Sequence, residues 1–124
     1  MALFGRSEEK AARDEAAQAE AERLQALSAV ELAEELMPAF GPDGPKPGKF
    51  INDLQVGAWL MSSYARGSNH LKELHEPIRE GLQALENAGL VEGRSRGGAA
   101  VLAKATRLGE QALTEGTVAS HLQG

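Results

Sequence analysis

Cysteine is absent from this 124-residue sequence, and aromatic residues make up only 4% of it. Without cysteine the chain can form no disulfide framework, no thiolate metal site and no thiol nucleophile. No apolar run approaches the ~18 residues that a membrane span requires. The start, MALFGRSEEK, turns polar within a few residues and is not typical of a secretory signal. These absences favour a cytoplasmic protein without a membrane partner.

Residue types that commonly perform catalysis are also sparse. His70, His75 and His121 are the only histidines, and the first two are five residues apart. That spacing does not place His70 and His75 on one helical face, as a pair of metal ligands on a helix requires. The glycine-rich segment GRSRGG (93–98) lacks the Lys-Ser/Thr ending of a phosphate-binding P-loop. The sequence therefore predicts no enzymatic activity, no metal site and no cofactor.

What the sequence does contain is enough chain for one core and an uneven distribution of charge. A chain of this length buries roughly two-thirds of the surface that its unfolded form exposes. The formal net charge is −5, and residues 1–36, with nine acidic and four basic residues, account for all of it. Residues 94–107 hold four basic residues and no acidic one. A surface for an anionic partner is therefore expected in 94–107.

The first 27 residues form an acidic, alanine-rich arm. Residues 7–27 contain no glycine or proline, and their composition favours a helix. Ala17, Ala21 and Leu24 recur at spacings of four and three, which gives a thin apolar seam. Two interpretations stay open: a solvated helical arm, or a helix that pairs with a second subunit. We divide the chain into this arm, 1–27, and a domain over 28–124.

Helical signals then flank a loop. Ser28 and Glu31 have the spacing of a capping box, which begins a helix. FGPDGPKPGK (40–49) is too rich in proline and glycine for a regular element. NDLQ (52–55) predicts another cap, followed by an apolar helix to about residue 65. The residues expected to be buried in that helix are Leu54, Val56, Trp59, Leu60 and Tyr64. An alternative for Trp59 and Tyr64 is the wall of an effector pocket.

The stretch from residue 70 onward predicts helices and a hairpin. HLKEL (70–74) predicts a short helix, and Pro77 suits the first turn of the next one. Gly89 is expected to end that helix. LVEGRS (90–95) and AVLAKA (100–105) predict two strands on either side of Arg96-Gly97-Gly98, and Thr106 is placed to cap a last helix. The expected fold is mainly α, in the α+β class, with a two-stranded β wing.

This order of elements resembles a winged helix-turn-helix domain. The residues that carry the resemblance include the segment LENAGLV and the spacing of Leu71, Ile78, Leu82, Leu85, Gly89, Leu90 and Val91. AKATRLGEQAL (103–113) is similar to the segment that follows the wing in PadR-like and MarR-like transcriptional regulators. The resemblance covers about residues 50–116. Gly81 replaces the aromatic residue usual in the recognition helix, and we expect it to admit a close neighbour or to loosen the helix.

The resemblance implies a DNA-binding regulator that acts as a homodimer through its N- and C-terminal helices. A recognition helix at about 77–88 would enter the major groove of double-stranded DNA, and a basic wing, 93–105, would lie against phosphates. Inward-facing Ile78, Leu82 and Leu85 leave Arg79, Gln83 and Asn87 outward for base edges. The residues predicted to contact phosphates are Arg94, Arg96, Lys104 and Arg107.

Acidic residues keep a second function open. Glu76, Glu80 and Glu86 would repel phosphates near the recognition helix. The outward face of that helix is therefore either a base-reading surface or a plain solvated one, and the basic residues of the wing are either phosphate contacts or solvated charges. The alternative is a winged helix that binds another protein and no DNA.

Overall fold

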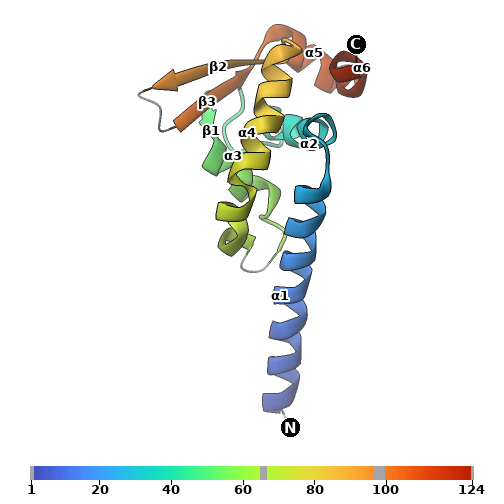
Figure 1. Ribbon diagram of the computed structural model, residues 1–124, viewed down its shortest axis with the longest axis vertical. Coiled ribbons are helices and arrows are strands. Elements are labelled where there is room, and N and C mark those ends of the chain that lie inside the picture. Colours follow the sequence, from blue (N-terminus) through green and yellow to red (C-terminus); the bar gives the residue numbers. More distant parts are fainter. Residues whose placement is uncertain (1, 65–66, 97–99, 124) are drawn as a thin grey trace.

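The computed structural model describes residues 2–64, 67–96 and 100–123, without the side chains of residues 2–11, 13, 68, 95–96 and 100–101. Its elements are α1 (Ala2–Ala26), α2 (Ala29–Leu36), the 3-10 helix η1 (Met37–Phe40), β1 (Ile51–Asn52), α3 (Asp53–Leu60), the 3-10 helix η2 (Gly67–His70), α4 (Leu71–Asn87), β2 (Val91–Arg96), β3 (Ala100–Ala105), α5 (Arg107–Glu115) and α6 (Val118–Gln123). The fold is mainly helical with one small antiparallel sheet (Figure 1).

The sheet has three strands in the order β1-β3-β2. In the hairpin, Val91 lies opposite Ala105 and Arg96 opposite Ala100, which confirms the two predicted strands. The sheet is larger than the predicted hairpin, because β1 adds a third strand with Ile51 opposite Ala103. A strand of two residues shows no alternation of apolar and polar side chains, so the sequence pattern gave no sign of it.

Helix α4 lies at the centre of the molecule and packs against α2 and α3. Its buried residues are Leu74, Ile78, Gly81, Leu82 and Leu85. A Cβ atom added at Gly81 would lie 2.7 Å from Cδ1 of Leu36, a buried leucine of α2. Gly81 therefore admits a close neighbour, which is one of the two roles expected for it.

The start of the predicted recognition helix, at residue 77, is wrong. Helix α4 runs without a break from Leu71, so the predicted short helix 70–74 and the next one are a single element with Pro77 inside it. Proline lacks the N–H that would bond the carbonyl four residues earlier, so an interior position is unfavourable. Leu74 and Ile78, on either side of Pro77, are both buried on one face, and this packing holds the helix together across the proline.

Helix α4 ends in a Schellman turn that leads directly into the hairpin. Gly89 has a φ of 77°, a conformation that glycine adopts without strain. The Gly89 N–H donates to the carbonyl of Glu86 (2.9 Å), and the Leu90 N–H donates to that of Leu85 (3.0 Å). The prediction that Gly89 ends the helix is confirmed, and the turn fixes the direction in which β2 leaves α4.

Helix α3 begins as predicted and ends earlier. Asn52 and Gln55 form a capping box, with Asn52 Oδ1 accepting from the Gln55 N–H at 2.7 Å. The last helical residue is Leu60, well before residue 65. Leu54 was expected in the core but is 60% exposed. Trp59 is half-buried, and its indole N–H donates to the Asp43 carbonyl at 3.1 Å, which ties α3 to the loop 41–49.

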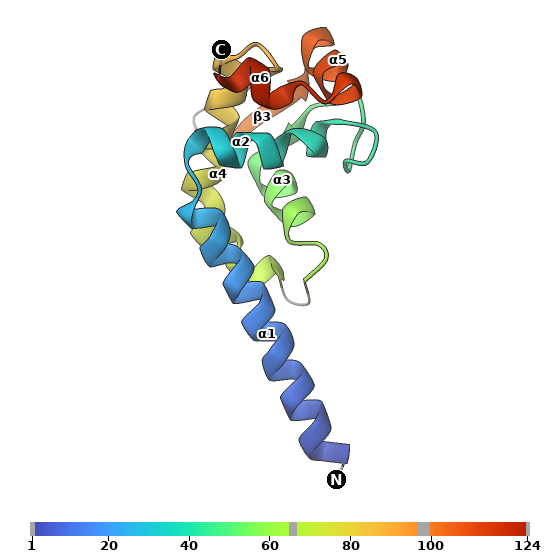
Figure 2. The same ribbon diagram turned by 90° about the vertical axis from the view of Figure 1, so that its right-hand side faces the viewer.

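The C-terminal half of α1 packs on its own chain. Ala17, Ala21 and Leu24 are buried, and α1 contacts α4 and η2. The predicted apolar seam therefore packs against helices of the same chain. The N-terminal half of the helix extends away from the rest of the molecule (Figures 1 and 2).

Helices α5 and α6 close the domain on the side of α2. Thr106 caps α5 as predicted, with its Oγ1 accepting from the Gly109 N–H at 3.0 Å. Gly116, with a φ of 70°, separates α5 from α6. Val118 of α6 is buried, and α6 packs on α2.

Candidate nucleic-acid interface

The two faces of the sheet have different surroundings. Side chains alternate between the faces along each strand, so Val91 and Ala103, which are buried, share the inner face with Gly93. Helix α4 covers this inner face, where it borders a hollow of about 280 Å³ together with the hairpin. Arg94 and Lys104 lie on the opposite, outer face.

On the outer face, two of the predicted phosphate contacts meet over one aromatic ring. Arg94 Cζ lies 4.7 Å from the centre of the Phe50 ring, and Lys104 Nζ lies 5.6 Å from it. Cations within about 6 Å of a ring centre are attracted to its face. Phe50 directly precedes β1, which brings it beside the hairpin. We refer to Phe50, Arg94 and Lys104 as the Phe50 cluster.

An acidic neighbour weakens the positive charge of the Phe50 cluster only slightly. Glu92 Oε1 lies 3.8 Å from Arg94 Nη2, and the two side chains are 54% and 61% exposed. Ion pairs with such exposure contribute little, because water screens them. The cluster therefore retains an excess of positive charge at the outer face of the sheet.

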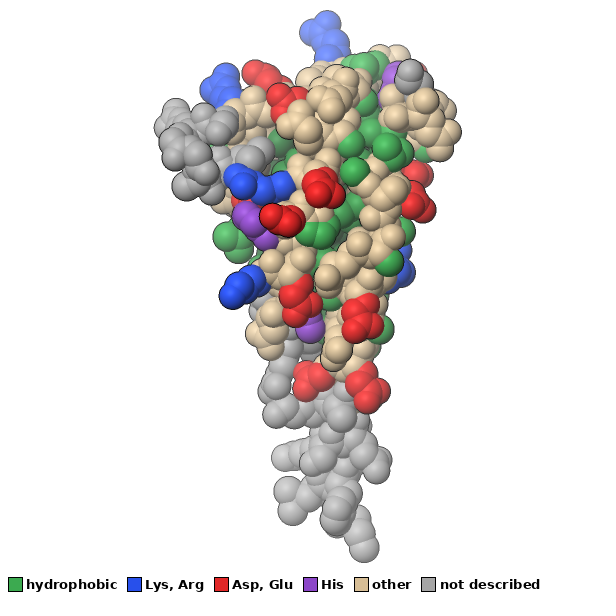
Figure 3. Space-filling view, in the orientation of Figure 1, with side chains coloured by type: hydrophobic (Ala, Val, Ile, Leu, Met, Phe, Trp, Pro, Cys, Tyr) green, Lys and Arg blue, Asp and Glu red, His purple; other side chains and the backbone are tan. Residues whose placement is uncertain are grey.

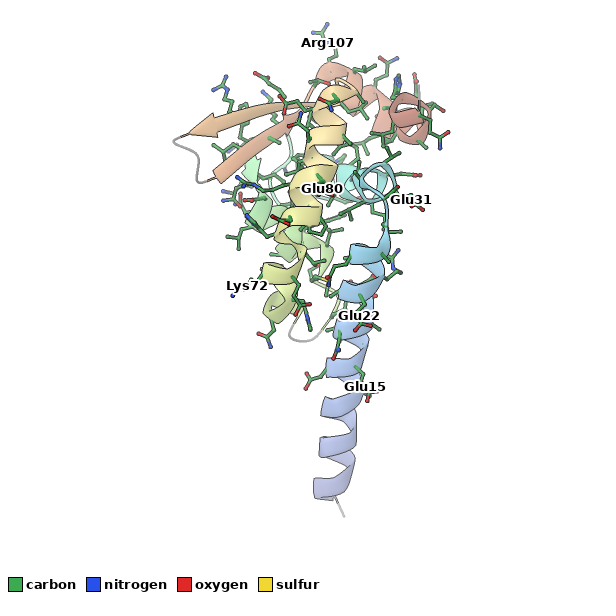
Figure 4. All side chains as sticks on the ribbon, in the orientation of Figure 1. Glu15, Glu22, Glu31, Lys72, Glu80 and Arg107 are labelled. Carbon is green, nitrogen blue, oxygen red and sulfur yellow. The ribbon has the colours of Figure 1, made fainter. Side chains whose placement is uncertain are left out.

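The other two predicted phosphate contacts lie outside this arrangement. Arg96 belongs to β2, but its side chain and the adjoining residues 97–99 are outside the part of the chain that the structure describes. Arg107 is exposed at the first residue of α5, and it projects from the end of the molecule far from the N-terminus of α1 (Figure 4). The structure thus unites Arg94 with Lys104 and leaves Arg107 apart.

The predicted base-reading residues all lie on the accessible side of α4. Gln83 and Asn87 are exposed, and Gln83 Nε2 donates to Asn87 Oδ1 at 2.9 Å. Arg79 lies at the edge of the helix nearest α3, with its side chain 37% exposed and its Nε 3.6 Å from Asp53 Oδ2. Because α4 faces the inner side of the sheet, these residues and the Phe50 cluster are on different sides of the hairpin.

The exposed face of α4 carries charges of both signs. Its acidic residues are Glu73, Glu76, Glu80 and Glu86, and its basic residues are Lys72 and the partly exposed Arg79. The space-filling view shows the acidic and basic side chains side by side on this face (Figure 3). The labelled Glu80 points outward from the middle of the helix (Figure 4). This face is therefore suited to directional hydrogen bonds more than to general attraction of phosphates.

Sequence reasoning missed two residues of this region. Phe50 stands at the end of a loop. Only the pairing of the following strand, β1, with β3 brings it under Arg94 and Lys104. The sequence places Asp53 within the predicted helix cap, and the structure shows that it is also the buried charged residue beside Arg79. The sequence held no signal for this role of Asp53, since an acid in the first turn of a helix is ordinarily explained by its favourable interaction with the helix dipole.

Compared with known protein families, curated proteins and solved structures, the chain matches none of them. Within the described residues, no three His, Asp or Glu side chains gather as metal ligands would. Across the same part of the chain, no helix combines the length and apolar character needed to cross a bilayer.

Proposed function

We propose that the protein is a transcriptional regulator of the winged-helix type that binds double-stranded DNA. The element order α2, β1, α3, α4, β2, β3 and the strand order β1-β3-β2 support this proposal. In such a domain α4 is the recognition helix and the β2–β3 hairpin is the wing.

The observation that carries the proposal is the Phe50 cluster. Two cations from neighbouring strands are held over one ring on an accessible sheet face, 4.7 Å and 5.6 Å from its centre. Like charges placed together repel, so a shared anion stabilises the arrangement. DNA phosphates are such anions. Each phosphate that the protein neutralises makes the slope of log affinity against log salt concentration, the salt slope, more negative by about 0.9. Arg94 and Lys104 therefore act as phosphate contacts, and Arg79 and Gln83 contact base edges.

Charge reversal at the Phe50 cluster tests this function. The variant Arg94→Glu/Lys104→Glu is compared with Lys46→Glu/Lys49→Glu, which changes the net charge equally at exposed positions of the loop 41–49. We expect the first variant to lose at least about 10-fold in affinity for random duplex fragments and to flatten the salt slope by roughly 2. The control is expected to change both much less. Equal losses in the two variants would reduce the effect to net charge and refute the assignment.

The acidic residues of α4 favour a second candidate function, a winged helix that binds a protein partner. Exposed Glu76, Glu80 and Glu86 oppose the approach of phosphates to this helix. A mobility-shift assay with random duplex fragments at low salt separates the two functions. Retention of DNA by the wild-type protein at micromolar concentration supports the regulator, and its absence supports the protein-binding module.

A further inference from the structure

Asp53, at the first position of α3, is a buried carboxylate, and a charged side chain contributes nothing to the apolar packing of the core. It is 5% exposed, and among the described residues it is the one charged residue that is buried. The capping box of Asn52 and Gln55 fixes the start of the helix and hence the position of Asp53. The Leu54 N–H donates to Asp53 Oδ1 at 3.0 Å, while Oδ2 has no hydrogen-bond partner among the described residues.

Two side chains of α4 face the unpartnered oxygen. His75 Nδ1 lies 3.3 Å from Asp53 Oδ2, and Arg79 Nε lies 3.6 Å from it. Arg79 Nε is itself buried and has no hydrogen-bond partner in the described part of the chain. A buried carboxylate is costly unless a donor or a cation compensates it. The guanidinium of Arg79 is therefore held against Asp53, and a shift of roughly half an ångström would form a hydrogen bond.

Holding Nε has a consequence for the rest of the Arg79 side chain. The guanidinium is planar and rigid, so fixing Nε fixes the direction of the two terminal amino groups. The side chain is 37% exposed and borders the hollow between α4 and the hairpin. A fork of two parallel N–H groups in a fixed orientation matches two adjacent acceptors, and in the major groove guanine offers such a pair in O6 and N7.

We propose that Asp53 is a positioning residue that holds the Arg79 fork for bidentate recognition of a guanine in duplex DNA. This inference rests on the proposed function, since it names the base that α4 reads. It assigns a role to a residue that does not itself touch the nucleic acid. The role is separate from that of the Phe50 cluster, which supplies phosphate contacts on the other side of the hairpin.

The experiment measures base preference and total affinity separately. Duplexes are selected from a random library with the wild-type protein, and each guanine of the selected site is replaced in turn by 7-deazaguanine, which lacks the N7 acceptor. We expect one replacement to weaken wild-type binding by about 10-fold. Asp53→Asn, which keeps the shape of the side chain, and Arg79→Lys, which keeps the charge, should each reduce that ratio to below about 3-fold. Glu80→Gln removes one negative charge from the exposed face of α4 and should leave the ratio unchanged.

The outcomes separate the inference from the proposed function. Arg79→Lys, at a partly exposed position, tests whether Arg79 reads the guanine, and Asp53→Asn, once circular dichroism shows that it folds, tests whether Asp53 positions Arg79. If Asp53→Asn lowers the melting temperature but keeps the 7-deazaguanine ratio, Asp53 is only structural and the inference is overturned. A selected site without guanine, or an unchanged ratio in Arg79→Lys, also overturns it while leaving DNA binding intact. Failure of the wild-type protein to retain any duplex overturns both.

Discussion

At the scale of single residues, glycine stands where two parts of the backbone come close. A Cβ atom added at Gly109, in the first turn of α5, would overlap the carbonyl oxygen of Leu90 and lie 2.8 Å from Met37 Cε. The same Leu90 carbonyl accepts from the Thr106 N–H at 3.0 Å. The start of α5 is thus seated directly on the turn between α4 and β2.

Gly109→Ala is expected to destabilise the protein by about 2–3 kcal/mol, even though alanine favours helix by about 1 kcal/mol relative to glycine. The obstacle is a backbone atom, which cannot rotate aside. Gln111→Ala, at an exposed position of the same helix, serves as the control and should change stability by less than about 0.5 kcal/mol. Urea denaturation of the three proteins measures the difference, and equal midpoints for wild type and Gly109→Ala would contradict the close seating of α5.

Single residues could be predicted where their partners are near in sequence. Ser28, Asn52 and Thr106 cap helices as expected, because a capping side chain bonds a backbone group three residues away. Phe50 and Asp53 could not be assigned in this way. Their partners lie tens of residues further along the chain, and only the folded topology brings them together.

At the scale of elements, α1 is tied to the domain by a polar cluster beside its buried seam. Arg23 donates hydrogen bonds to Glu20 of α1 and to Glu35 of α2. The Tyr64 hydroxyl donates to Glu20 at 3.1 Å. The hydrogen bond from Arg23, followed by that from Tyr64, lowers the pKa of Glu20 below its ordinary 4.5. The bond to Glu20 raises the pKa of Tyr64 above its ordinary 10.0. The cluster therefore needs an ionised Glu20 and a protonated Tyr64.

The stabilisation of α1 by this cluster is expected to depend on pH at both ends. A carboxyl whose pKa is lowered by folding stabilises above its unfolded value, and this contribution is lost as pH falls through the folded value. A phenol whose pKa is raised stabilises below about pH 10 and loses that contribution at higher pH. The melting temperature of the wild type should exceed that of Glu20→Gln near pH 7. The gap should narrow as pH falls below 4.5 toward the lowered pKa of Glu20, and above pH 10 it should shrink only by the part that Tyr64 contributes, because the Arg23 bond to Glu20 persists. A gap that stays constant with pH would contradict the role of Glu20.

Elements could be predicted where their signals were strong and local. The hairpin strands and the end of α4 at Gly89 followed from apolar runs and one glycine. Pro77 misled the prediction, because burial of Leu74 and Ile78 outweighs the loss of one hydrogen bond within α4. Strand β1 was not predicted, because its two residues are extended through their pairing with β3 and carry no strand pattern of their own.

At the scale of the whole molecule, the backbone of the N-terminal half of α1 lies apart from the rest of the chain that the structure describes (Figures 1 and 2). Both ribbon views show it extending clear of the domain. The first buried side chain of α1 among the described residues is Ala17. An isolated helix of this length is marginal in water. We therefore propose that this half pairs with a second copy of the chain. The C-terminal helices α5 and α6, which were expected at the same interface, lie at the opposite end of the molecule (Figures 1 and 2) and take no part in this pairing.

Removal of residues 1–12 tests this proposal. The full chain is expected to be a dimer in size-exclusion chromatography with light scattering at high micromolar concentration, and the shortened chain a monomer. The fold should survive the deletion, because the seam from Ala17 to Leu24 is retained. A full chain that runs as a monomer, or a shortened chain that stays a dimer, would refute pairing through the arm.

The hydrogen bond between Trp59 and the loop 41–49 makes Trp59 an intrinsic fluorescence probe of this contact. The sequence contains one tryptophan, and its indole N–H meets the Asp43 carbonyl. All indole fluorescence of the chain therefore arises at a single junction, where a helix touches an irregular segment. A shift in the colour of that emission reports the separation of these two parts alone, without any attached dye.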